Sequence, residues 1–272
     1  MNSEDIGLGL HLCRQAGWNQ LESDWRRFLS MQPQGCFVGE LDGASVATTT
    51  TCIFGSVAWI AMVLVEMSAR RKGVATALLK HAMDYLDEQG VRSIRLDATA
   101  AGQPVYEKLG FVPEYRLSRY QGIAPQMKEP SEVTAASADR LREIVSLDRQ
   151  MTGTHREKML SRLFEESPQE TQILCREDRL DGFVTVRQGF NATEIGPCVA
   201  TPDAGPALLK AALGRCAGRP VFIDIPHDNA PAVALAETSG LGVQRDFMRM
   251  CRGERVRDVP AAIWASSGPE KG

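Results

Sequence analysis

One stretch, residues 57–111, constrains the fold of this 272-residue chain more than any other. It begins with the uninterrupted apolar run 57–65, which predicts a central strand buried on both faces. The basic turn Arg70-Arg71-Lys72-Gly73 follows, and apolar residues then recur at helical spacing from Ala75 to Leu86. The predicted order is therefore a buried strand, a basic turn and an amphipathic helix.

A turn of this kind suits an anion. The first N–H groups of a helix lack intrahelical partners and its dipole is positive at that end, so a pyrophosphate is a fitting ligand. Arg70, Arg71 and Lys72 add positive charge, Gly73 lets the backbone approach closely, and Ala75 keeps the first helical turn open. A basic cluster before a helix can also be a solvated loop, so the motif alone indicates the site without establishing it.

The next segments of the chain help to decide between an anion site and a solvated loop. Residues 93–97 predict a strand, and residues 103–110 predict a short helix with proline near its start and glycine at its end. The combination resembles the GNAT superfamily of acyl-CoA N-acyltransferases. The signature Q/R-x-x-G-x-G/A of that family is met by Arg70, Gly73 and Ala75, and its Tyr-Glu-Lys-Leu-Gly-Phe signature stands intact at residues 106–111.

Three positions depart from the family pattern. Met67 stands where proline is frequent, and Thr99 and Gly102 stand where asparagine and alanine usually precede the tyrosine. These positions concern the pantetheine arm more than the pyrophosphate. We expect them to tune affinity for the co-substrate.

The resemblance implies a role for each candidate residue, with acetyl-CoA as co-substrate and no metal. Backbone N–H groups near Leu64 and Val65 would bind the thioester carbonyl and the pantetheine amides, and Tyr106 would protonate the departing thiolate. Trp18, Asn19 and Gln20 would contact the acceptor, although Trp18 could instead anchor a loop. The pyrophosphate would bind the turn formed by Arg70, Arg71, Lys72, Gly73, Val74 and Ala75.

The general base stays open at this stage. Asp97 ends a predicted strand and is our first candidate, with Glu40 and Glu66 as alternatives. A carboxylate at a strand end can also simply cap a loop. His81 is expected to face solvent, and His227 could point into a cleft between the two halves of the chain.

The first half has the expected order of a GNAT domain. Helices at 6–13 and 21–31 precede a hairpin with the turn Asp42-Gly43, which joins strand 57–65 in an antiparallel meander. Pro113 is expected to interrupt the chain before a last strand at 115–120. Almost no chain precedes the first helix, so the usual first strand is expected to be missing and the sheet edge left for something else to cover.

The second half repeats this order without its chemistry. Residues 229–241 align with 99–111, Ala236 takes the place of Tyr106, and 202–207 replaces the basic turn with an aspartate and two prolines. Helices are expected at 141–151, 157–164, 207–217 and 230–238, and strands at 171–176, 182–187, 193–199, 220–225 and 243–251.

The expected fold class is therefore α/β (α+β), with two tandem GNAT-like domains that each have a mixed, mainly antiparallel twisted sheet flanked by helices. The catalytic domain spans 1–122, a linker 123–136, the degenerate domain 137–253 and a tail 254–272. The tail is expected to be loose apart from an Ile263-Trp264 anchor. The second domain is expected to complete the acceptor pocket.

The composition of the chain argues against several other classes of function. A net charge of -3 argues against nucleic-acid and anionic membrane surfaces as partners. The seven scattered cysteines form no C-x-x-C pair, which predicts reduced thiols in the cytoplasm. The favoured activity is N-acetylation of a small-molecule primary amine by a monomer or homodimer. A non-catalytic acyl-CoA-binding or regulatory protein is the alternative.

Overall fold

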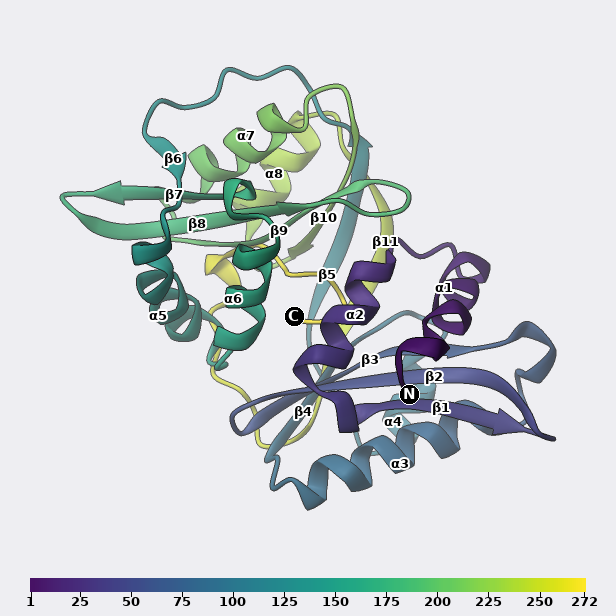
Figure 1. The fold of residues 1–272 in the computed structure, drawn as a ribbon. Coiled ribbons are helices and arrows are strands. Elements are labelled where there is room, and N and C mark those ends of the chain that lie inside the picture. Colours follow the sequence, from purple (N-terminus) through teal and green to yellow (C-terminus); the bar gives the residue numbers. More distant parts are fainter.

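The computed structural model describes every residue from 1 to 272. Its two halves contribute to one 12-stranded sheet in the order β1-β2-β3-β4-β11-β5-β10-β9-β8-β7-β6, with β12 paired to β9 (Figure 1). The first half contains α1 (Ile6–Gln15), α2 (Glu22–Met31), β1 (Cys36–Leu41), β2 (Ala44–Phe54), β3 (Val57–Val65), α3 (Val74–Glu88), β4 (Ser93–Ala98), α4 (Gln103–Lys108) and β5 (Val112–Ile123).

The second half repeats that order of helices and strands, as the sequence predicts. It contains β6 (Val133–Ala135), α5 (Leu141–Thr152), α6 (Glu157–Glu166), β7 (Thr171–Arg176), β8 (Arg179–Arg187), β9 (Thr193–Ala200), α7 (Gly205–Arg215), β10 (Pro220–Pro226), α8 (Ala230–Thr238), β11 (Gly242–Gly253) and β12 (Ile263–Ala265). None of the helices has the length and apolar character needed to cross a membrane.

Helices cover both faces of the sheet. In the first half α3 packs on β1, β2 and β3, and α1 and α2 pack against the strands on the opposite face. In the second half α7 and α8 cover one face and α5 the other, while α6 contacts α2 across the middle of the molecule (Figure 1). A shared core joins the halves, since Trp59 and Phe54 pack with Met159 and Phe183.

The last strands of the two halves are exchanged between them. β11 lies between β4 and β5, and β5 in turn pairs with β10. Each half therefore completes its part of the sheet with a strand from the other half. As a result, the middle of β11, at Met248, lies beside the carboxyl end of β4, at Ala98.

Two local expectations are wrong. Pro113 does not interrupt the chain but lies within β5, opposite a register shift in β11. Within the predicted linker 123–136, the short strand β6 pairs with β7. The tail is not loose, because nearly every residue from 262 to 272 is buried, and Figure 1 places the C-terminus near the middle of the molecule.

The Ile263-Trp264 anchor is present, with both side chains buried. The expected sheet edge is also present at β1, since no strand precedes α1.

Candidate active site

The central strands β3 and β4 separate along their length. They pair in parallel only where residues 57–59 face residues 93–95. β4 pairs with β11 on its other side along its whole length, and the opening between β3 and β4 beyond these residues lies at a cavity of about 810 Å³. Residues 60–65 line it from β3, so backbone groups on that side of the strand are available to a ligand.

A bulge in β3 shapes this opening. The register with β2 shifts between Thr48 and Thr50, and Met62 adopts a left-handed φ of 52°. Such backbone is costly for a non-glycine residue and persists where its surroundings enforce it. The buried Thr48 Oγ1 donates to the Met62 carbonyl at 2.9 Å, which satisfies the group that the bulge removes from regular pairing.

The basic turn lies at the end of the same strand. Gly73 caps α3 with φ 82°, and a Cβ there would meet no atom within 4 Å, so the space above the helix N-terminus is open. Arg70 Nε donates to the Val65 carbonyl at 3.0 Å, which ties the turn to β3. Arg70 and Ala75 line the cavity, as do Leu64 and Val65.

The remaining predicted turn residues lie just outside the cavity wall. Arg71 and Lys72 are solvent-exposed, and Val74 is half-buried in the first turn of α3. This placement leaves both cations free to meet a phosphate at the mouth of the cavity.

Tyr106, on α4, lines the same cavity. Its hydroxyl has no hydrogen-bond partner in the chain, and burial raises its pKa to about 12, so the phenol keeps its proton at neutral pH. The ring packs edge-on to Phe111. A Cβ at Gly102 would lie 2.9 Å from Tyr106 Cε2, so glycine at this position makes room for the ring.

The other end of the cavity is built from both halves of the chain. Trp18 and Gln20, in the connection between α1 and α2, line it. The remaining residues come from β5, from β11 and from the end of the chain: Arg119, Arg245, Asp246, Phe247, Pro269 and Glu270. The second half therefore contributes directly to the cavity.

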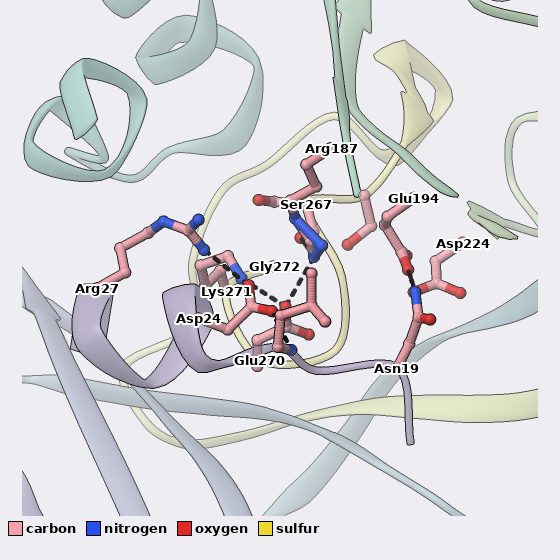
Figure 2. Close-up of polar contacts among 12 residues, drawn as sticks. Asn19, Asp24, Arg27, Arg187, Glu194, Asp224, Ser267, Glu270, Lys271 and Gly272 are labelled. Carbon is pink, nitrogen blue, oxygen red and sulfur yellow. Dashed lines mark hydrogen bonds and ion pairs between the residues drawn. The ribbon is translucent and has the colours of Figure 1, made fainter. Parts of the chain in front are cut away.

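Asn19 does not line the cavity, so its placement does not support the predicted contact with substrate. Its Nδ2 donates to the Ala192 carbonyl at 3.0 Å and to Glu194 Oε2 at 3.2 Å. Its Oδ1 accepts from the N–H groups of Asn191 and Ala192 at 2.8 and 3.0 Å. Figure 2 shows Asn19 reaching Glu194, so this side chain joins the two halves.

The end of the chain carries a buried ionic network between α2 and β8 (Figure 2). Glu270 Oε1 accepts from Arg187 at 2.7 Å and from Lys271, and these cations lower the pKa of Glu270 to about 2. Burial lowers the pKa of Lys271 to about 8. Glu270 Oε2 has no partner, although the side chain is buried and lines the cavity.

Asp97 also lines the cavity but is engaged. Both of its oxygens accept from Arg249, each at 2.8 Å, and burial raises its pKa against the opposing effect of Arg249. The two alternative carboxylates, Glu40 and Glu66, lie outside the cavity. Glu66 accepts from Gln15 at 2.6 Å and lies 2.9 Å from His11.

The histidines lie outside the cavity wall. His81 is exposed on α3, as predicted, and His155 is also exposed. His227 Nε2 lies 2.7 Å from Ser118 Oγ, which in turn donates to the cavity residue Asp246. No group of three or more histidine, cysteine or acidic side chains is placed to hold a metal ion.

The corresponding opening in the second half is filled by the chain itself. β9 and β10 pair in parallel only where residues 193–195 face residues 221–223, and β12 then pairs with β9 and contacts β10. A Cβ on Gly205, at the start of α7, would lie 1.8 Å from the Trp264 ring. Helix α7 corresponds to α3 of the first half, and the Trp264 indole occupies the space above its N-terminus.

Comparison with known proteins identifies this arrangement. A model of the acetyltransferase (GNAT) family matches residues 10–111, and a model of an acetyltransferase (GNAT) domain matches residues 144–265. The chain belongs to the GNAT superfamily. Its tandem GNAT halves are the two units that the sequence repeat predicts.

Individual relatives cover most of the chain. Holothin acyltransferase from Pseudoalteromonas sp. is 28% identical over 94% of this chain and 87% of its own length. A Pyrococcus horikoshii structure, provisionally described as an acetyltransferase, matches with a TM-score of 0.85 and 24% identity over 100% of this chain and 94% of its own. A tandem GNAT protein from the clavulanic acid biosynthesis pathway matches with a TM-score of 0.64 and 14% identity over 94% of this chain and 97% of its own.

GNAT proteins typically bind acyl-CoA, and the first half of this chain offers features that fit it. The separated strands leave backbone donors and acceptors of β3 on the cavity side, which suits the amides of a pantetheine arm. The open N-terminus of α3 and its cations suit a pyrophosphate. The second half lacks the open cleft, because β12 and Trp264 fill it.

The end of the cavity that both halves build is the part that the sequence predicts least. Arg119, Arg245 and Glu270 look like ordinary strand or tail residues in sequence, and only the strand exchange and the buried tail bring them to the cavity. Asp246 and Phe247 reach it by the same route. A weak signal existed in the alternating pattern of residues 243–251, which indicates a half-buried strand without naming its neighbours.

Proposed function

We propose that this protein is an acetyl-CoA-dependent N-acetyltransferase that acts on the primary amine of a small molecule. The observation that carries the proposal is one continuous cavity. It joins the cofactor turn, the open edge of β3 and the unpaired phenol of Tyr106 to a polar end built by both halves. A relative that spans nearly the whole chain is named as an acyltransferase of holothin, which supports the same reaction class.

Acetyl-CoA would supply a thioester whose carbonyl carbon accepts the amine. Backbone N–H groups near Leu64 and Val65 would bind the carbonyl oxygen as it becomes negative, because fixed donors stabilise developing charge in a site shielded from water. Tyr106 would give its phenolic proton to the sulfur as the C–S bond breaks. Its raised pKa keeps that proton available across the neutral range.

The proton lost by the amine needs an acceptor. Asp97 remains the candidate from the sequence, and the structure adds a constraint, because protonating Asp97 would disrupt its ion pair with Arg249. Asp97→Asn tests this role. A pH–rate profile that keeps its acidic limb in this variant would assign deprotonation to water or to another group.

We propose the following organisation around this site. Residues 1–122 form the catalytic half, with 123–136 as the connection. Residues 137–253 act as a scaffold, and 254–272 complete the acceptor end. We also propose a cytoplasmic location, which all seven free cysteines fit.

The test is a screen of primary amines with acetyl-CoA that follows free-thiol release and confirms acetylated product by mass. Arg70→Ala/Arg71→Ala is the cofactor-site control and should remove the activity. Binding of acetyl-CoA without transfer to any amine would favour the alternative, a non-catalytic acyl-CoA-binding protein.

A further inference from the structure

Two arginines face each other across neighbouring strands at the acceptor end of the cavity. Arg119 on β5 and Arg245 on β11 are direct partners in the antiparallel register, and both line the cavity. Like charges placed directly opposite one another destabilise a sheet. An opposite charge close to each member would offset this repulsion.

Only one of the two arginines has its counterion within the chain. Arg119 donates to both oxygens of Asp224, each at 2.7 Å, and to Glu194 at 3.2 Å. Arg245 makes no hydrogen bond or ion pair with the chain. Burial and the charge of Arg119 both lower its pKa, and the charge of Asp224 only partly opposes them. Arg245 is therefore an unpaired guanidinium at the cavity wall.

The position of Arg245 on β11 shows which face of the sheet its side chain occupies. Residues 245, 247 and 249 share one face of β11, since the register is regular between them. Arg249 bonds Asp97 on that face, whereas Met248 and Met250 pack on the other face with α3 and α4. The cofactor turn belongs to α3, so Arg245 lies on the side of α1, α2 and the chain end, where the acceptor would enter.

An unpaired acidic oxygen lines the same cavity. Glu270 Oε1 is occupied by Arg187 and Lys271, but Oε2 is buried without a partner. Only 3% of Glu270 is exposed, so bulk water does not readily donate a hydrogen bond to this oxygen. β12 anchors the segment that carries it, which fixes the carboxylate in place.

We infer that the acceptor is a small zwitterion, an amino acid or similar compound, whose carboxylate binds Arg245 and whose amine binds Glu270. This inference rests on the proposed function and names its substrate class. A guanidinium matches a carboxylate with two parallel hydrogen bonds, and the free oxygen of Glu270 matches an N–H donor. The carboxylate of the acceptor would pair with the free guanidinium of Arg245, and its amine would donate to Glu270 Oε2.

The experiment compares matched acceptors. L-alanine, L-leucine and L-phenylalanine are assayed beside their carboxamides and their decarboxylated amines, with rates compared at equal concentrations of neutral amine. Wild-type protein should favour the amino acids in kcat/KM. Arg245→Gln should lower kcat/KM for them by about 10- to 100-fold, the range for a lost hydrogen bond to a charged group, and leave the carboxamides unchanged.

Two further variants sharpen the test. Glu270→Gln should lower kcat/KM for all three kinds of amine, because all of them carry the amine. Arg142→Gln is the matched control, since Arg142 is an exposed arginine on α5 without a partner. It should behave as wild type. Carboxamides accepted as well as amino acids by wild-type protein would overturn the inference and leave the proposed function intact.

A stability readout does not depend on turnover. Arg245→Gln should raise Tm by about 1–3 °C in the free protein, because it removes the like charge opposite Arg119, and Arg142→Gln should not. With CoA present, L-leucine should raise the Tm of wild-type protein and L-leucinamide should not. Failure of every amine to react would refute the proposed function, and equal stabilisation by both compounds would refute the zwitterion.

Discussion

Replacing Tyr106 by phenylalanine removes one oxygen atom from the proposed proton donor. That hydroxyl has no hydrogen-bond partner in the chain and lies at the cavity wall, so its loss breaks no intramolecular contact. The ring keeps its packing on Phe111. We expect the free energy of unfolding to change by less than about 0.5 kcal/mol, and acetyl-CoA affinity to be retained.

The loss should appear in kcat. General acid catalysis typically contributes ~10²-fold or more, which corresponds to about 2.7 kcal/mol in the barrier. The pKa of about 12 adds a second signature, because the wild-type rate should not decline up to about pH 9 through ionisation of this phenol. The assay is thiol release under saturating acetyl-CoA, measured with an amine found in the screen.

Two variants separate chemistry from packing. Tyr115→Phe is the opposite case, because its hydroxyl donates to Asp258 at 2.9 Å and accepts from Arg249 at 2.6 Å, so stability should fall by about 1–3 kcal/mol. Gly102→Ala keeps the Tyr106 hydroxyl but moves the ring, and should lower kcat. Wild-type turnover by Tyr106→Phe across the pH range would refute the assignment of Tyr106 as the proton donor.

Two further predictions concern the junction between the halves. Asn19→Ala removes four hydrogen bonds to residues 191–194 and should lower the free energy of unfolding, measured in urea, by about 2–4 kcal/mol. Asn191→Ala loses one exposed side-chain hydrogen bond and should cost less than about 1 kcal/mol. Equal losses in the two variants would contradict the role given to Asn19. Burial raises the pKa of Glu194 from 4.5 to about 7, so the folded protein holds this proton more tightly than the unfolded chain, and this contribution to stability should be lost as pH rises from about 5 through 7. Glu194→Gln should flatten that part of the pH–stability curve, and an unchanged slope would argue against the shift.

Much of the first half could be predicted because each element carries its own local pattern. The apolar run of β3, the Asp42-Gly43 turn and the spacing of α3 each determine a structure within a few residues. The same holds for the cofactor turn and Tyr106, where a compact motif places the side chains. Local signals of this kind survive in tertiary structure when the fold agrees with them.

The acceptor end depends on contacts that no local pattern encodes. Residues 115–120 and 243–251 have similar strand patterns, so the sequence does not show that β11 crosses to pair with β4. The polar tail Ser-Ser-Gly-Pro-Glu-Lys-Gly suggests solvent, yet it is buried, and its Glu270 forms ion pairs with Arg187 and Lys271. Asp97 looked free at a strand end because its partner Arg249 lies far along the chain.

The most direct test of the account is a calorimetric titration of the intact chain with acetyl-CoA. We predict saturation at one equivalent, because β3 and β4 open at the basic turn while β12 and Trp264 fill the matching place in the second half. Arg70→Ala/Arg71→Ala should abolish this binding, and Arg142→Gln should preserve it. A second equivalent, or binding that survives the double substitution, would contradict a single acyl-CoA site in the first half.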